Sequence, residues 1–158
     1  QSRPSLDILV RIIGWRDPDS KEKMPETVSQ KNVTIEHTGR LSFTDYLKKI
    51  EDTDIFLDLR SITLENNHCL PIKLFLYAAY GKPVILSDLK AIKKEIDISQ
   101  FGFSVNPEST EEISKLIGNY IDNPDLYNDH CLKAREMIAS KYNWGTIKNR
   151  FIGFVTQF

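Results

Sequence analysis

Residues 54–87 decide the fold, and they read DIFLDLRSITLENNHCLPIKLFLYAAYGKPVILS. An apolar run at 54–59 predicts a strand, and the helical period that follows at 70–80 ends at Gly81. The next apolar run, 83–86, has no polar alternation, which is typical of a strand buried on both faces. Strand, loop, helix and strand in this order predict a parallel sheet covered by helices.

Apolar runs of the same kind recur on both sides of this stretch. They bring the predicted strands to five, at residues 6–13, 33–37, 54–59, 83–86 and 101–105. A further helix is expected at 43–50 behind a Ser42-x-x-Asp45 capping box, and the pattern is wholly helical from residue 108 onward. The predicted fold class is therefore α/β, with a parallel sheet core over 1–107 and a C-terminal helical tail over 108–158.

Size and charge exclude several classes of protein. The chain has 158 residues, so we expect a single domain over 1–158. Its 21 Lys and Arg against 22 Asp and Glu leave a net charge of -1, which gives no general attraction to nucleic acid. The longest apolar stretches are far shorter than the roughly 20 residues of a membrane helix. We expect a cytoplasmic protein with no nucleic-acid partner and no transmembrane segment, at most peripheral at the inner membrane face.

Common catalytic signatures are absent from the sequence, which has no GxGxxG, GxxxxGK[ST], HExxH or GxSxG. His68 and Cys69 are neighbours in the chain and rarely point at each other as a base and a nucleophile must, so we interpret Cys69 as a core residue. Asp17-Pro18-Asp19 has the DxD form of a metal-binding triplet. It lies in a charged segment, and we interpret it as a solvated loop. No metal site is predicted.

The start of the helix at 70–80 is the strongest candidate for a binding site. In an open parallel sheet, ligands bind at the carboxyl ends of the strands, where loops meet helix N-termini. Pro71 near the first helical position leaves the N–H groups of Ile72 and Lys73 free, with the ammonium of Lys73 nearby. This arrangement suits a diphosphate. The alternative, in which Pro71 merely begins a helix and Lys73 is solvated, stays open.

Residues 71–87, PIKLFLYAAYGKPVILS, resemble the P-x-K-L-x-E-Y-M-A-x-G-K-P-V-I-x-S segment of the retaining group 1 glycosyltransferases, which use nucleotide sugars and have the GT-B fold. Further segments fall in the order of that family, at 9–14, 32–41, 54–61, 101–107 and 142–144. The resemblance implies the C-terminal, donor-binding domain of such an enzyme, without the N-terminal acceptor domain and without the family's opening strand and helix. If the strands on either side of that missing strand become neighbours, the five remaining strands form a Rossmann-like sheet of order 2-1-3-4-5.

The resemblance also assigns site residues. It implies that Gly39, Arg40 and Leu41 lie against the nucleotide base. It further implies that the diphosphate of a UDP- or GDP-sugar is bound at the start of the helix, by Leu70, Ile72 and Lys73. No cofactor is required beyond this donor substrate.

Two acids of the family pattern are replaced here. Leu76 stands where the family has a glutamate that binds the donor ribose, and the partner position eight residues earlier falls on His68. Glu65, four residues after Ser61, is the candidate catalytic residue in place of the earlier acid, provided that the loop carries a short insertion. The alternative, a solvated loop glutamate, stays open.

The implied function is the donor-binding half of a glycosyltransferase that transfers a sugar to a glycan or lipid-linked acceptor with retention of configuration. Its partners would be the nucleotide sugar and the N-terminal domain, and the chain alone is expected to transfer no sugar. On the last helix we expect exposed aromatic side chains that support self-association, at Trp144, Phe151, Phe154 and Phe158.

Two other functions stay open. One is a noncatalytic binding module of the same fold, which has lost the acids at positions 68 and 76. The other is a receiver-like signalling domain with Asp58 as phosphoacceptor. A receiver needs a pair of carboxylates after its first strand, where this chain has Ile13-Gly14-Trp15.

Overall fold

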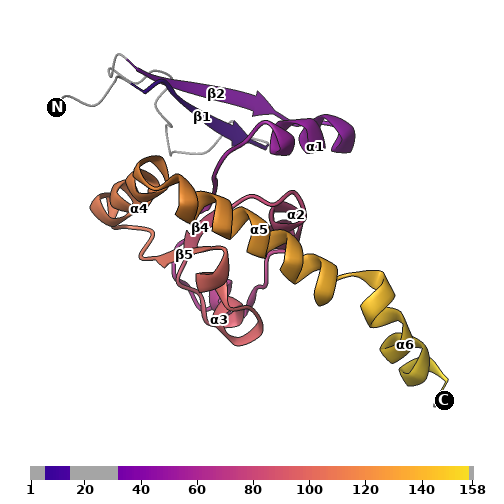
Figure 1. The fold of residues 1–158 in the computed structure, drawn as a ribbon. Coiled ribbons are helices and arrows are strands. Elements are labelled where there is room, and N and C mark those ends of the chain that lie inside the picture. The colour runs from indigo at the N-terminus through magenta and orange to yellow at the C-terminus, as the bar shows by residue number, and fades with distance from the viewer. Residues whose placement is uncertain (1–5, 15–31, 157–158) are drawn as a thin grey trace. The chain divides into compact units, whose positions relative to one another are not determined.

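The computed structural model describes residues 6–14 and 32–156 (Figure 1). Asp17, Asp19 and Phe158 lie outside the described residues. The chain divides into two compact units, Gln1–Glu51 and Asp52–Phe158. The expectation of one domain over 1–158 stays a prediction.

The first unit is a two-stranded parallel sheet followed by a helix. Strand β1 (Ile8–Ile13) pairs with β2 (Val33–Gly39), and a bulge between Ile12 and Ile13 shifts the register near the end of the pair. Helix α1 (Phe43–Glu51) begins at the predicted capping box. The Asp45 N–H donates to Ser42 Oγ at 3.2 Å, and the Ser42 hydroxyl donates to Asp45 Oδ2 at 2.7 Å.

The second unit holds the other three strands, β3 (Phe56–Asp58), β4 (Val84–Ser87) and β5 (Gly102–Val105). They are parallel, in the order β3-β4-β5. All four residues of β4 are buried, as its unbroken apolar pattern predicts. The α/β class with parallel strands is confirmed.

The strands form one sheet in each unit, β1-β2 in the first and β3-β4-β5 in the second. Within each sheet the neighbours are those of the predicted order 2-1-3-4-5, and all the pairs are parallel.

Helices pack on both faces of the second sheet. Leu74 and Tyr77 of α2 (Ile72–Ala79) line a small cavity together with Phe56 and Val84, and the rings of Phe56 and Tyr77 stack with centroids 3.7 Å apart. The opposite face is covered by α4 (Thr110–Asp122) and the first turns of α5 (Pro124–Ser140). Their shared core contains Ile85, Val105, Tyr120, Phe103, Ile113, Leu116, Ile117, Leu126 and Tyr127.

Three short helices complete the second unit, η1 (Asn66–His68), α3 (Lys90–Glu95) and η2 (Ile98–Gln100). The last helix, α6 (Trp144–Val155), is longer. The Asn143 side chain caps α6 by accepting from the Thr146 N–H at 2.9 Å. Cys69 was expected in the core but is exposed, because it follows η1 in the surface segment between β3 and α2.

A buried histidine gives the second unit a pH-dependent stability. His130 is 4% exposed, lies 2.8 Å from the Tyr120 hydroxyl through Nδ1, and has a pKa held below its usual range by burial. The unfolded chain therefore binds more protons than the folded one below about pH 6.5, the usual pKa of histidine, and stability falls as the pH drops from there.

We expect the stability advantage of the wild type over His130→Gln to shrink between pH 7 and pH 5, with a slope of at most about 1.4 kcal/mol per pH unit for one proton. Urea titrations of both proteins across this range measure it. Glutamine keeps a side-chain carbonyl that can accept from Tyr120 and does not titrate. A difference independent of pH would contradict the prediction.

Candidate functional site

The first turn of α2 has the features that the sequence predicts for an anion site. Its N-cap is Pro71, which makes no side-chain capping hydrogen bond, and the turn contains no acidic residue. The amides of Ile72 and Lys73 precede the first intrahelical donor, because the Leu74 N–H is the one that reaches Pro71 O, at 3.1 Å. The side chains of Ile72 and Lys73 are exposed, whereas Leu70 is partly buried.

The segment from β3 to α2 is fixed at the carboxyl end of the sheet by Ser87. Its fully buried hydroxyl donates to Arg60 O at 2.6 Å and approaches Asp58 O at 3.5 Å. The guanidinium of Arg60 pairs with the carboxylate of Asp58, with Nε and Oδ1 3.0 Å apart. The last residue of β4 thus holds the start of the segment that leads to α2. Sequence reasoning assigned no role to Arg60.

Two asparagines shape the rest of this segment. The Asn66 side-chain amide donates to Ser61 O at 2.8 Å, and Asn67 Oδ1 accepts from the Lys90 N–H at 3.0 Å. Glu65 precedes η1 with an exposed side chain that makes no capping hydrogen bond. His68, at the position of the family's first acid, is exposed as well. Asn66 and Asn67 are adjacent in the sequence, and asparagine favours turns. This pair is the sequence feature that could have indicated an ordered segment here.

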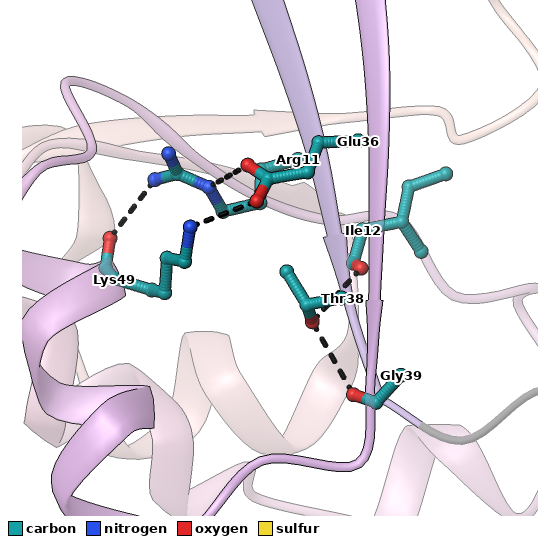
Figure 2. Close-up of polar contacts among 6 residues, drawn as sticks. All are labelled: Arg11, Ile12, Glu36, Thr38, Gly39 and Lys49. Atoms are coloured by element: carbon teal, nitrogen blue, oxygen red, sulfur yellow. Dashed lines mark hydrogen bonds and ion pairs between the residues drawn. The ribbon is translucent and has the colours of Figure 1, made fainter.

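The residues assigned to the nucleotide base lie in the first unit, in the turn between β2 and α1. Gly39 has a φ of +65°, which a residue with a side chain rarely adopts. Its carbonyl accepts from the Gly14 N–H and from the Thr38 hydroxyl, both at 3.2 Å; Figure 2 shows the Thr38 contact. Arg40 is exposed and Leu41 is partly buried. The backbone of this turn is therefore held in place.

A cluster of three charged side chains fixes α1 to the first sheet. Glu36 Oε2 lies 2.6 Å from Arg11 Nε, and Glu36 Oε1 lies 2.8 Å from Lys49 Nζ (Figure 2). Arg11 Nη1 also donates to Lys49 O at 3.3 Å. The hydrogen bonds from Lys49 and Arg11 hold the pKa of Glu36 below its usual range. The cluster constrains both ends of the turn at 39–41, since it ties β2 to α1.

The predicted site residues thus fall into two groups. Residues 39–41 belong to the first unit, and Glu65, Leu70, Ile72 and Lys73 belong to one segment of the second. In the described part of the chain, no group of three His, Cys, Asp or Glu side chains is placed to hold a metal. An open groove of about 500 Å³ is lined by residues 93–99 and Ser104, and it includes none of the predicted site residues.

Residues 3–152 match a family described as glycosyl transferase-like. The chain belongs to this glycosyl transferase-like family. No curated protein matches the chain. Among the described residues, no helix is both long and apolar enough to cross a bilayer.

Two solved structures resemble the glycosyl transferase-like chain. HepE (Alr3699) of Anabaena, in complex with UDP, matches with 13% identity and a TM-score of 0.68, over 78% of this chain and 32% of that one. Sucrose-phosphate synthase from Thermosynechococcus elongatus matches with 17% identity and a TM-score of 0.64, over 80% of this chain and 30% of that one. This likeness confirms the predicted Rossmann-like fold of the GT-B type. The chain spans about a third of the length of these two proteins.

Proposed function

We propose that this chain is the donor-binding part of a nucleotide-sugar-dependent, retaining glycosyltransferase. The observation that carries the proposal is the first turn of α2, which combines uncapped amides, an exposed lysine and no acid in a chain of the glycosyl transferase-like family. Helix N-termini with these features bind phosphate groups. The diphosphate would contact the amides of Ile72 and Lys73 and the Lys73 ammonium, with Leu70 beside them.

The proposed role of these groups in catalysis is electrostatic. When the glycosidic bond to the donor breaks, negative charge grows on the leaving diphosphate. Fixed N–H dipoles and the Lys73 ammonium stabilise such charge without rearranging, and no metal is required for this step. The acceptor, a glycan or a lipid-linked sugar, would be bound by an N-terminal domain. The chain alone is therefore expected to bind a nucleoside diphosphate weakly and to transfer no sugar.

The nucleoside would be bound by other residues. Gly39 supplies a turn whose backbone is fixed, and Arg40 and Leu41 follow it, so this turn is the proposed contact for the base. Glu65 is the proposed catalytic carboxylate, because it is the exposed acid of the segment between β3 and α2.

The diphosphate assignment predicts which lysine matters for binding. We expect Lys73→Ala to weaken the binding of UDP and GDP by about tenfold or more, since a charge-assisted contact contributes about 1.5–3 kcal/mol. Isothermal titration of the chain with each nucleotide measures it. Lys115→Ala, which removes an exposed lysine from α4, and Asp17→Ala are expected to leave the affinity unchanged. Equal weakening by Lys115→Ala would show that only net charge matters.

A noncatalytic binding module is the second candidate, and one observation favours it. The half-buried side chain of Leu76 stands on α2 where the family has an acid, and an aliphatic chain cannot accept a hydrogen bond from a ribose hydroxyl. The two candidates differ in one measurement. Sugar transfer by the chain joined to an acceptor domain would support the enzyme, whereas nucleotide binding without transfer would support the module.

A further inference from the structure

A β-bulge shapes the end of β2, directly before the turn at 39–41. Successive residues of β1, Ile12 and Ile13, pair with residues of β2 on either side of Thr38, which is therefore the extra residue. The Thr38 hydroxyl lies 3.4 Å from Ile12 O and 3.2 Å from Gly39 O, so it lies across the bulge (Figure 2). Bulges redirect the chain and re-aim side chains. The course of the chain into the turn is thus set by the bulge and by the positive φ of Gly39.

The turn itself carries backbone groups that its own structure does not use. The described residues donate no hydrogen bond to the backbone of Arg40 or Leu41 and accept none from it. The carbonyl of Gly39, by contrast, already accepts two hydrogen bonds. The N–H and C=O groups of Arg40 and Leu41 can therefore pair with the donors and acceptors on the edge of a base. Such pairing depends on where the backbone of the turn is held.

Three side chains, called here the charged cluster, hold the elements on either side of this turn. Glu36 of β2 uses one carboxylate oxygen for Arg11 of β1 and the other for Lys49 of α1. The side chains of Arg11, Glu36 and Lys49 are 13%, 34% and 32% exposed. In the neighbouring pair of Lys48 with Asp45, the two side chains are 70% and 58% exposed and 3.6 Å apart. Because water and salt screen partly buried pairs less, the charged cluster constrains the chain more than that exposed pair does.

We propose that Glu36, Arg11 and Lys49 are positioning residues for the nucleoside base and act through the turn at 39–41. The inference rests on the proposed function, in which this turn contacts the base. Glu36 and Lys49 are 13 positions apart in the chain, with the turn between them, so their contact closes a loop that contains it. A turn that is already held in place loses less conformational freedom on binding. In this role none of the three side chains contacts the nucleotide.

Two neighbouring lysines of α1 provide a matched test by isothermal titration of the 158-residue chain. Lys49→Met removes a member of the charged cluster, whereas Lys48→Met removes the same charge from the exposed pair. We expect Lys49→Met to weaken the binding of UDP by about five- to thirtyfold, which corresponds to the cost of ordering the backbone of one residue. Its affinity for inorganic pyrophosphate, which has no base, should be unchanged. Lys48→Met should leave both affinities unchanged.

Two more variants separate positioning from a loss of charge. Lys49→Arg keeps a charge-assisted hydrogen bond to Glu36 and should bind UDP nearly as the wild type does. Thr38→Val removes the hydroxyl at the bulge without changing the charge of the chain. It should weaken the binding of UDP and leave the binding of pyrophosphate unchanged.

The outcomes distinguish this inference from the proposed function. If Lys49→Met and Thr38→Val bound UDP as tightly as the wild type, the positioning role would be overturned and the proposed function would stand. Equal weakening of UDP and pyrophosphate by Lys49→Met, with a changed circular dichroism spectrum, would show that the charged cluster supports only the fold and would also overturn the inference. A wild-type chain that bound neither ligand would contradict the proposed function and, with it, this inference.

Discussion

Gly102→Ala is expected to destabilise the protein by about 3 kcal/mol or more, the upper part of the range for overpacking a core. Gly102 begins β5 directly opposite Val84 of β4. A Cβ at this position would overlap the Val84 carbonyl oxygen and would come within 2.6 Å of Val84 Cγ2. The carbonyl belongs to the backbone of the central strand and cannot turn away as a side chain can. The variant should therefore push β5 away from β4.

Gly118→Ala is the matched control, because it adds the same methyl group in the same unit. A Cβ at Gly118 of α4 meets no atom within 4 Å. Alanine favours the helix over glycine by up to about 1 kcal/mol, so this variant is expected to be neutral or stabilising. Urea midpoints of the two variants measure the contrast. Similar midpoints would contradict the close approach of β5 to β4.

The central part of the second unit could be predicted because its signals are local. The apolar run before Ser87 and the stop at Gly81 lie within a few residues of the elements that they define. The helix-start signal at Pro71 likewise placed Ile72 and Lys73 on the first turn of α2. Short elements such as α3 escaped prediction, since six residues with one buried position, Ile92, show no clear period.

The parts that escaped prediction depend on residues distant in sequence. The Ser87 hydroxyl reaches Arg60 O because β3 and β4 pair in one particular register. The residue types at positions 60 and 61 do not indicate this hydrogen bond. The capping box at Ser42 was predicted correctly, since its donor and acceptor are three residues apart.

The order of the segment around Glu65 is also a product of distant contacts. The Asn67 side chain accepts from the backbone N–H of Lys90, the first residue of α3. The position of η1, in the segment after β3, therefore depends on the segment that follows β4. The sequence identified Glu65 as the acid nearest to the family position. It could not show that the side chain is exposed within an ordered segment.

Two aliphatic side chains of α2, two positions apart, are expected to differ in their effect on stability when each is truncated to alanine. Leu74 is 1% exposed and lines a small cavity with Phe56, Tyr77 and Leu86, whereas Ile72 is 84% exposed. Leu74→Ala leaves a cavity between α2 and the sheet and should destabilise the protein by about 3 kcal/mol, within the range for buried leucines. Ile72→Ala should leave the urea midpoint unchanged.

Nucleotide binding adds a second contrast between these variants. Ile72→Ala keeps the amide proposed to contact the diphosphate, so its affinity for UDP should equal that of the wild type. Leu74 anchors the turn that carries Lys73, and its loss should weaken binding even under conditions where circular dichroism shows the variant to be folded. If Leu74→Ala bound UDP as tightly as the wild type while remaining destabilised, the position of α2 on the sheet would not control the site, and the diphosphate would have to be bound elsewhere.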